Sequence, residues 1–141
     1  MQAAFGLAQL ERISELVERK WEIFGWYADA FRDCDGLKLN AELAGTKNSY
    51  WMSTVVWDRT FAPLKNDVVQ EMRARGVDVR PFFHPLSSLP AYAGAPSARC
   101  ASERNRVSYD IGNRAINLPS GFSLTRGDVD RVSSVLRSVL S

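Results

Sequence analysis

The chain has 141 residues, the size of one domain, and its 45% hydrophobic and 11% aromatic residues are enough for a buried core without disulfides. The 18 Lys and Arg residues against 16 Asp and Glu give a net charge of +2, and without a dense basic run this charge disfavours nucleic acid as a partner. The lack of an 18-residue apolar run and of a basic-then-apolar leader predicts a cytoplasmic protein that does not enter a membrane.

Residues 1–33 have the apolar periodicity of a long amphipathic helix or of two abutting helices. Apolar side chains recur at intervals of three and four residues: Leu7, Leu10, Ile13, Leu16, Val17, Trp21, Phe24, Tyr27, Ala28 and Phe31. A bend is expected at Gly6 or Gly25, because glycine weakens a helix interior by about 1 kcal/mol relative to alanine.

The first turns of this region are apolar on nearly every side, with only Gln2 and Gln9 as polar residues. A helical segment of this kind is expected to be covered by other protein. We therefore predict an interface there, with Phe5, Leu7 and Leu10 as its contact residues.

A loop and then a strand are predicted next. Residues 33–49 have the glycine, asparagine and scattered charge of a loop, and residues 50–57 (YWMSTVVW) have the length and the aromatic and β-branched content of a buried strand. Trp51 and Trp57 then lie on the same strand face, because their positions differ by an even number. If the Trp51 ring is buried, its truncation to alanine costs about 3–5 kcal/mol.

A short helix is expected to begin at Asn66 or Asp67 and to end at Gly76. Residues 77–80 (VDVR) alternate in the manner of a second strand. Four of the six prolines fall within residues 81–96, so this stretch is expected to be extended and turning, and not a regular helix.

The next predicted helix covers residues 97–113 or 104–113 and places Val107 and Ile111 on one face. Residues 115–118 (AINL) form the third predicted strand. A Pro-Ser-Gly turn ends it.

Thr125 and Asp128 have the spacing of an N-cap pair at the start of the last helix. Its buried stripe is expected to consist of Val129, Val132, Leu136, Val139 and Leu140. The predicted fold class is α+β, a small, three-stranded, mainly antiparallel sheet packed with helices. The prediction treats residues 1–141 as a single domain with a helical region at 1–33 and a core of sheet and helices at 48–141.

The loop that starts at Arg80 is the best candidate for contact with a ligand. Phe82, Phe83 and Tyr92 are able to stack on a base or a sugar. Arg80 and His84 are able to pair with a phosphate or a carboxylate. In the alternative interpretation the two phenylalanines alternate as strand residues, one of them in the core, and the prolines only shape a connection.

Other reactive residues do not form a recognisable catalytic or metal site. Cys34 and Cys100 flank the single histidine, His84, without the spacing of a zinc or redox motif, so both are expected to be buried free thiols. The Arg-Gly-Asp triplet at residues 126–128 falls in the first turn of a predicted helix and is not interpreted as an adhesion motif. We see no pair of carboxylates on one helix face, and we assign no catalytic residue and no metal ligand.

Four blocks of sequence carry a resemblance to a known family. They are residues 2–11 (QAAFGLAQLE), 50–56 (YWMSTVV), 75–86 (RGVDVRPFFHPL) and 116–121 (INLPSG). In this order and spacing the chain resembles the nucleotide-sugar aminotransferases of the DegT/DnrJ/EryC1/StrS family, most closely members like perosamine synthase. The resemblance spans nearly all of the chain.

The resemblance implies the small C-terminal domain of a dimeric, fold-type-I enzyme that depends on pyridoxal phosphate (PLP). Such enzymes move an amino group from glutamate to a 4-keto sugar on a nucleotide, of the GDP-4-keto-6-deoxymannose type for perosamine, in bacterial polysaccharide biosynthesis. By this resemblance, Arg80, Phe83, His84 and Tyr92 are the candidate substrate-binding residues.

The family's Schiff-base lysine, its aspartate for the pyridine nitrogen and its phosphate-binding residues lie upstream of the matching blocks. None of the four lysines stands in the family's lysine motif: Lys20, Lys38, Lys47 and Lys65. We therefore expect that this chain alone binds no cofactor and does not catalyse. The expected partners are a second copy or a PLP-binding large domain, with a nucleotide sugar as ligand. The alternative is a non-catalytic assembly module that self-associates or complements a separately encoded PLP domain.

Overall fold

The computed structural model describes residues 1–61 and 64–140 and has the predicted α+β class. Its described part contains a four-stranded antiparallel sheet in the order β1-β2-β4-β3. The strands are β1 (Leu37–Leu39), β2 (Ser53–Trp57), β3 (Arg80–Pro81) and β4 (Ala115–Leu118). The third predicted strand, residues 115–118, is confirmed.

The prediction of three strands is wrong by one, because β1 lies in the stretch predicted to be a loop. Its three residues pair with the end of β2, with Leu37 opposite Trp57 and Leu39 opposite Val55. A run this short carries little periodicity, and its strand conformation depends on pairing with residues that lie 16 or more positions away.

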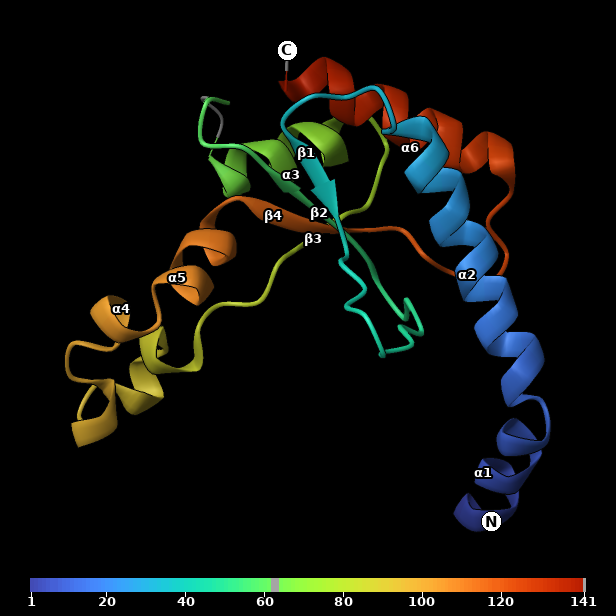
Figure 1. Cartoon of the computed structure of the whole chain (residues 1–141), viewed down its shortest axis with the longest axis horizontal. Helices are drawn as coiled ribbons and strands as arrows, with labels where there is room; N and C mark the ends of the chain where they lie inside the picture. Colours follow the sequence, from blue (N-terminus) through green and yellow to red (C-terminus); the bar gives the residue numbers. More distant parts are fainter. Residues whose placement is uncertain (62–63, 141) are drawn as a thin grey trace.

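Three helices cover one face of the sheet: α2 (Ile13–Ala30), α3 (Lys65–Ala74) and α6 (Arg126–Leu140) (Figure 1). Between this face and the helices lies the core, formed by Ile23, Tyr27, Phe31, Val55, Trp57, Val68, Val69, Met72, Val77, Val79, Ile116, Leu118, Val129, Val132, Leu136 and Leu140. Because side chains alternate along a strand, Thr54 and Asn117 point to the opposite face, which we call the concave face.

The N-terminal region forms two helices, as one of the two alternatives predicted, but the bend is at Arg12 and not at Gly6 or Gly25. Helix α1 (Gln2–Glu11) ends where Arg12 leaves helical geometry at φ −107° and ψ 10°, and α2 begins at the next residue. Both glycines sit inside helices with open space around them. Here the helix tolerates the small propensity cost of glycine.

The strand predicted over residues 50–57 begins only at Ser53. Tyr50 has a left-handed backbone (φ 46°), and its ring stacks on Phe24 of α2 at a centroid distance of 3.7 Å. Trp51 is therefore outside the ladder and 60% exposed, whereas Trp57 is 1% exposed. The expectation that the two rings share one strand face is wrong, because the strand does not include Trp51.

The second predicted strand, residues 77–80, is reduced to a two-residue edge strand, β3. Val77 and Val79 are buried in the core but precede the ladder. The helix before them is α3, which begins at Lys65, just ahead of the predicted start, and is stopped as predicted by Gly76 at φ +75°.

The proline-rich stretch contains three single turns of 3₁₀ helix, Leu86–Ser88, Pro90–Tyr92 and Pro96–Ala98. Two short helices follow, α4 (Ala101–Arg104) and α5 (Arg106–Asn113). Val107 and Ile111 both lie in α5, four positions apart and so on one face as predicted, but Val107 is 71% exposed. We call residues 83–113, which run out from the sheet and back to it, the arm.

Helix α6 starts as predicted. The Thr125 hydroxyl and the Asp128 carboxylate are joined at 2.7 Å, and each also binds the other's backbone N–H. Four of the five predicted stripe residues are buried, and Val139 is partly buried. The cap residues and the apolar spacing in the sequence were therefore sufficient to predict this helix.

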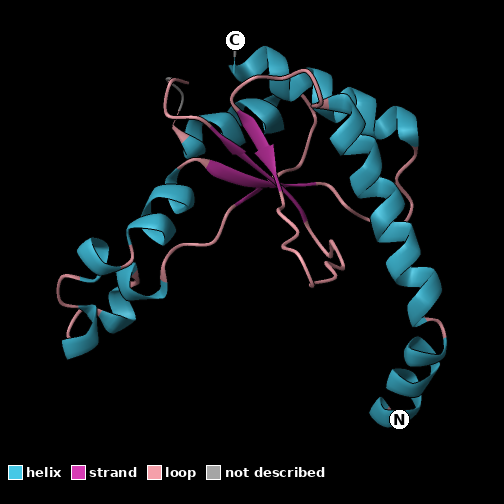
Figure 2. Cartoon of the chain, viewed as in Figure 1, coloured by secondary structure: helices cyan, strands magenta, loops and turns pink. Residues whose placement is uncertain are grey.

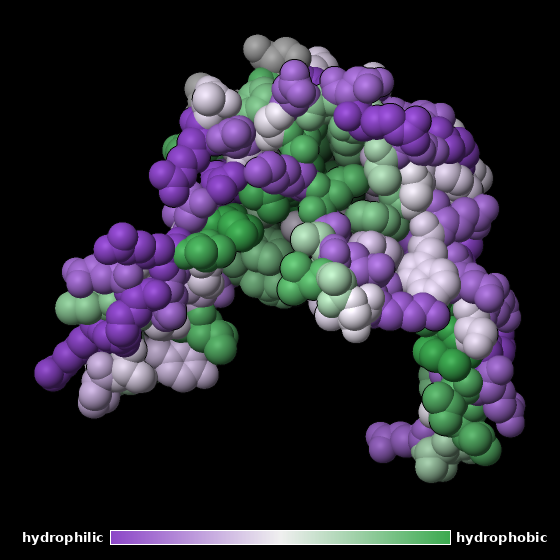
Figure 3. All heavy atoms as spheres, viewed as in Figure 1, coloured by the Kyte–Doolittle hydropathy of each residue, from purple (hydrophilic) through white to green (hydrophobic). Residues whose placement is uncertain are grey.

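The whole molecule has the outline of an arch. The sheet and its helices form the top, α1 and the start of α2 form one limb, and the arm forms the other; Figure 2 shows that both limbs are mostly helical. Figure 3 shows hydrophobic side chains gathered on the inner side of the arch. Among the described residues, none of the helices combines the length and apolar composition that a membrane crossing requires.

Candidate functional site

The concave face of the sheet carries a pocket of about 500 Å³, within the size range of small-ligand sites. Its wall consists of residues in or next to each of the four strands and of one residue of α5. They are Gly36, Lys38, Leu39, Asn40, Ala41, Thr54, Val56, Trp57, Asp58, Phe82, Ile111 and Arg114. The lining side chains include two cations, Lys38 and Arg114, the carboxylate of Asp58, a hydroxyl and an amide. This mixture suits a polar ligand.

A polar row crosses the concave face from β1 to β3. Asn40 accepts a hydrogen bond from the backbone N–H of Thr54 at 2.7 Å, and the Thr54 hydroxyl donates to the amide oxygen of Asn117 at 2.7 Å. Arg80 stands opposite Asn117 in the ladder. The row extends the hydrogen bonding of the sheet through side chains and brings Arg80 to the edge of the concave face.

Arg114 is held at the rim of this pocket by a half-buried ion-pair cluster. Its guanidinium donates to both carboxylate oxygens of Asp110 at 3.1 and 2.6 Å and also to the carbonyl oxygen of Trp57, and Arg59 donates to Asp110 at 3.0 Å. The hydrogen bonds from Arg114 and Arg59 lower the pKa of Asp110 to about 2, against the opposing effect of desolvation. The charge of Arg114 is thus largely compensated within the protein.

The four predicted substrate-binding residues lie along the arm and its root. Arg80 forms an exposed ion pair with Asp78 at 3.0 Å. Phe83 is 57% exposed. His84, the next residue, is also exposed.

Tyr92 lies farther along the arm than the other three. It is 48% exposed and lines a separate pocket of about 520 Å³ with Pro85, Leu86, Ser87, Ser97, Ala98, Asn105 and Ser108. The pocket on the concave face is instead lined by Phe82, whose ring meets that of Phe83 edge to face at 5.6 Å. Of the four predicted residues, Tyr92 lines one of these two pockets, whereas Arg80, Phe83 and His84 line neither.

The root of the arm is fastened by a buried lysine that sequence reasoning did not single out. Lys65, the first residue of α3, is 5% exposed, and its amine donates to the carbonyl oxygens of Phe82 at 3.2 Å and Gly112 at 2.5 Å. Burial lowers the pKa of the Lys65 ammonium. Its position at a helix start gave no signal, because only the fold brings the two carbonyls together.

A second fastening joins α2 to the turn after β4. The guanidinium of Arg19 donates to the carbonyl oxygens of Phe122 at 3.2 Å and Leu124 at 2.5 Å, and the phenol of Tyr27 donates to Pro119 at 2.8 Å. Burial raises the pKa of the Tyr27 hydroxyl, which therefore remains a donor. These bonds orient the helical limb relative to the sheet.

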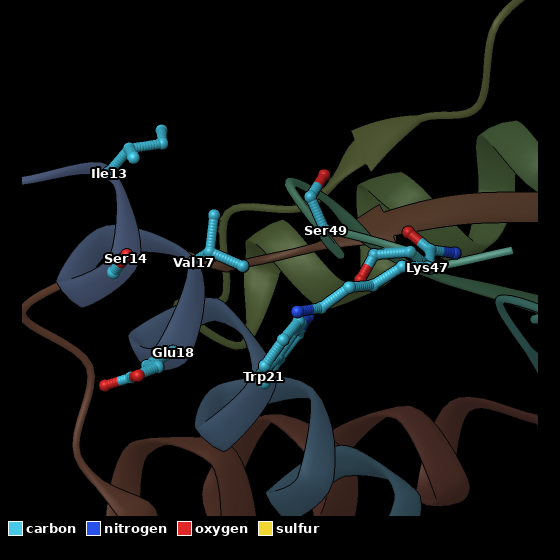
Figure 4. A pocket seen from close by; sticks show the side chains of 8 residues that line it. Ile13, Ser14, Val17, Glu18, Trp21, Lys47 and Ser49 are labelled. Atoms are coloured by element: carbon cyan, nitrogen blue, oxygen red, sulfur yellow. The ribbon is translucent and has the colours of Figure 1, made fainter. Parts of the chain in front are cut away.

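A smaller pocket of about 360 Å³ lies between the first turns of α2 and residues 47–49 of the loop that joins β1 to β2 (Figure 4). Trp21 donates its indole N–H to the carbonyl oxygen of Asn48 at 2.7 Å, and the amine of Lys47 lies 4.3 Å from the Trp21 ring centroid. Ile13 and Val17 supply its apolar wall. The contacts anchor the loop on α2.

The described lysines do not fit the anchoring of an aldehyde cofactor, which needs a desolvated and accessible amine. Lys20 donates to the carbonyl oxygen of Ser120, Lys47 lies over an aromatic ring, and Lys65 is closed in between two carbonyls. Lys38 is exposed on β1.

The two cysteines are not the buried thiols that the sequence suggested. Cys34 is half-buried, and Cys100 is exposed in a left-handed turn at φ 51° ahead of α4. Within the described residues, no group of three or more His, Cys, Asp or Glu side chains is placed to hold a metal ion.

Comparison with known proteins places these features in a family. The family model described as the DegT/DnrJ/EryC1/StrS aminotransferase family matches residues 1–137. The chain belongs to this family. The DegT/DnrJ/EryC1/StrS aminotransferases depend on PLP, and the resemblance found in the four sequence blocks is confirmed.

Curated relatives within the DegT/DnrJ/EryC1/StrS family include GDP-perosamine synthases. The protein of that name from Caulobacter vibrioides is 32% identical over 99% of this chain and 37% of its own length. The GDP-perosamine synthase of Vibrio cholerae is 27% identical over 96% of this chain and 36% of its own length. The chain thus spans about a third of the length of the curated relatives it matches.

Solved structures of aminotransferases share the fold. The aminotransferase PseC of Helicobacter pylori matches 99% of this chain and 36% of its own with a TM-score of 0.84 at 19% identity. The sugar aminotransferase Spr1654 of Streptococcus pneumoniae matches 97% of this chain and 34% of its own with a TM-score of 0.83 at 24% identity. The arrangement of sheet, limbs and arm is therefore that of part of a sugar aminotransferase.

Proposed function

We propose that this chain is the substrate-side part of a PLP-dependent nucleotide-sugar aminotransferase, acting on a GDP-4-keto-6-deoxymannose type of substrate and inactive without a PLP-binding large domain. The observation that carries the proposal is the family match over residues 1–137 by a chain that spans only 34–37% of its relatives. The large domain belongs either to the same polypeptide or to a second one.

In this proposal the chain binds and orients the substrate. Phe83 and Tyr92 offer exposed rings for stacking against the base or the sugar, and His84 offers a nitrogen to a hydroxyl or a phosphate. Arg80 already forms an exposed ion pair and can exchange Asp78 for a diphosphate at low cost, since exposed pairs contribute about 0–1 kcal/mol. The cofactor supplies the electron sink for amino transfer.

The test is a reconstitution. The chain alone, mixed with PLP and then reduced with borohydride, should gain no covalent pyridoxyl group by mass spectrometry, and it should not transfer an amino group from glutamate. Addition of a family large domain should restore amino transfer to a GDP-linked 4-keto sugar. Transamination by the purified chain alone, or none by the complete assembly, contradicts the proposal.

A second candidate function is assembly, and α1 favours it. The helix has no buried residue, and Phe5, Leu7 and Leu10 are 70%, 58% and 64% exposed. Apolar side chains left open in this way along a helix favour burial against another protein. In this function the chain self-associates or complements a separate PLP domain through α1, and sedimentation at several concentrations detects the self-association.

A further inference from the structure

Three segments that are far apart in sequence meet at the root of the arm. The amine of Lys65 bonds the carbonyl oxygen of Phe82, at the point where the chain leaves β3, and that of Gly112, near the end of α5. The start of α3 thereby ties the segment that enters the arm to the helix that returns from it.

Gly112 also passes close to the outgoing segment of the arm. A Cβ atom at this position would lie 3.3 Å from Cδ of Pro85 and 3.4 Å from the carbonyl oxygen of Phe83, which is tighter than most Cβ contacts in proteins. The absence of a side chain is therefore what lets the segment at Phe83–Pro85 pass so close to α5.

The two contacts bracket the exposed residues of the arm. Lys65 bonds the backbone at Phe82, and the backbone of Gly112 packs closely against Pro85. The residues between these points are Phe83 and His84, whose side chains are exposed. A backbone that is restrained on both sides limits the directions in which its side chains can point, and such preorganisation strengthens binding by lowering the entropy cost.

We propose that Lys65 and Gly112 are positioning residues that hold Phe83 and His84 in the orientation in which they contact the nucleotide sugar. The inference rests on the proposed function for its substrate and on the geometry of the junction for its residues. It assigns the buried amine a geometric role: its hydrogen bonds fix where the arm leaves the sheet.

The first experiment measures the arm in the chain alone. Backbone ¹⁵N relaxation should show order parameters of Phe83 and His84 falling from about 0.85 to below about 0.6 in Lys65→Met, which fills the same space without donors. Lys65→Arg keeps donors and should retain more of the order. Val129→Ala, a buried substitution in α6, is the control for general loosening of the core and should leave the arm unchanged. If the order parameters of Phe83 and His84 do not change in Lys65→Met, the inference is overturned, and this result does not depend on the function of the protein.

The second experiment uses the assembly with a PLP-binding large domain. Lys65→Met and Gly112→Ala should raise KM for the nucleotide sugar by about 10-fold to 100-fold, because a displacement of about 1 Å can have an effect of that size. KM for glutamate and kcat should stay within about twofold. A purely structural role would lower the active fraction and leave both KM values unchanged, and this result overturns the inference.

The two experiments separate the inference from the proposed function. If the unmodified assembly transfers no amino group, the proposed function fails. The relaxation data still test whether Lys65 orders Phe83 and His84. If the unmodified assembly is active and Lys65→Met loosens the arm with no change in KM for the sugar, the positioning role is refuted and the proposed function stands.

Discussion

The same residue type has opposite roles at two positions of this chain. Trp57 ends β2 with its ring in the core at 1% exposure, whereas Trp51 precedes the strand and is 60% exposed. The difference arises because Tyr50 turns the backbone into a left-handed conformation before the ladder begins. Residue type alone did not distinguish them.

Trp57→Ala is expected to lower the free energy of unfolding by about 3–5 kcal/mol, because it removes a buried aromatic ring and leaves a cavity. Trp51→Ala is the matched control and should stay within about 0.5 kcal/mol of the unmodified protein. Urea denaturation followed by far-ultraviolet circular dichroism measures both. Equal losses in the two variants would contradict the burial described here.

Because of Asp110, the free energy of unfolding should depend on pH in the acidic range. Its pKa is lowered from 3.8 to about 2 in the folded protein, so its favourable contribution is complete above about pH 4 and is lost as pH falls towards 2. Asp110→Asn should cost about 1–2 kcal/mol at pH 7, between the values for exposed and buried ion pairs.

Denaturation at a series of pH values checks this expectation. The difference in unfolding free energy between the unmodified protein and Asp110→Asn should be constant above about pH 4 and should shrink below it. Asp130→Asn, which removes an exposed pair with Arg126 at 3.4 Å, is the control and should change little. A difference that does not vary between pH 4 and pH 2 would show that Asp110 is not stabilised by its arginines.

At the scale of elements, α6 owes its start to a side-chain cap. Thr125→Ala removes the hydroxyl that binds the backbone N–H of Asp128, and it should lower the unfolding free energy by about 1 kcal/mol, within the range of 0.5–2 for such caps. Ser123→Ala, two residues earlier and exposed, should have no measurable effect. Thermal unfolding of both variants detects the difference, and a silent Thr125→Ala would refute the cap.

Helix α1 is the element whose environment is least explained by the rest of the chain, because its hydrogen bonds are made but its apolar side chains are not covered. Phe5→Asp is expected to weaken self-association by at least about tenfold, since it places a charge in an apolar contact. It should leave the unfolding free energy of the core unchanged. Sedimentation velocity over a range of concentrations measures the effect.

The control for this prediction is Gln9→Asp, which introduces the same charge into the same helix at a polar residue. It should leave association nearly as it is in the unmodified protein. A chain that remains monomeric at every concentration, with α1 freely accessible to solvent, would exclude self-association and leave the large domain as the only proposed partner of this helix.

For the whole molecule, the arch leaves apolar groups open on its inner side (Figure 3). In the proposed assembly the large domain fills this space. Hydroxyl-radical footprinting should then show protection of Phe5, Trp51 and Phe83 on addition of the large domain, while Leu64, at the start of α3, keeps its reactivity. Protection of Leu64 in preference to the other three would place the large domain on the wrong side of the sheet.

Much of the fold followed from local patterns in the chain. The stop at Gly76, strand β4, the cap at Thr125 and the stripe of α6 were all predicted, since each depends on residues within a few positions of one another. The family was also predicted, because four blocks in a fixed order are specific without any knowledge of their contacts.

The candidate site was predicted only in outline. The arm residues Phe83 and His84 were selected by their chemistry, but Lys65, Thr54 and Asn117 were not. Asn117 offered a signal, since a polar residue between Ile116 and Leu118 marks the second face of a strand. Lys65 offered none, because its acceptors are carbonyls, which the identity of a side chain does not reveal.

The sequence by itself determined the fold class, the family and the ends of the elements that are set by caps and glycines, because those features depend on neighbours along the chain. Tertiary structure alone decided that residues 37–39 join the sheet, that Trp51 faces solvent, and that Lys65 closes the root of the arm. These outcomes depend on pairing between segments 16 to 47 positions apart. The physical reason is that hydrogen bonds and burial in three dimensions outweigh local propensities of a few tenths of a kcal/mol per residue.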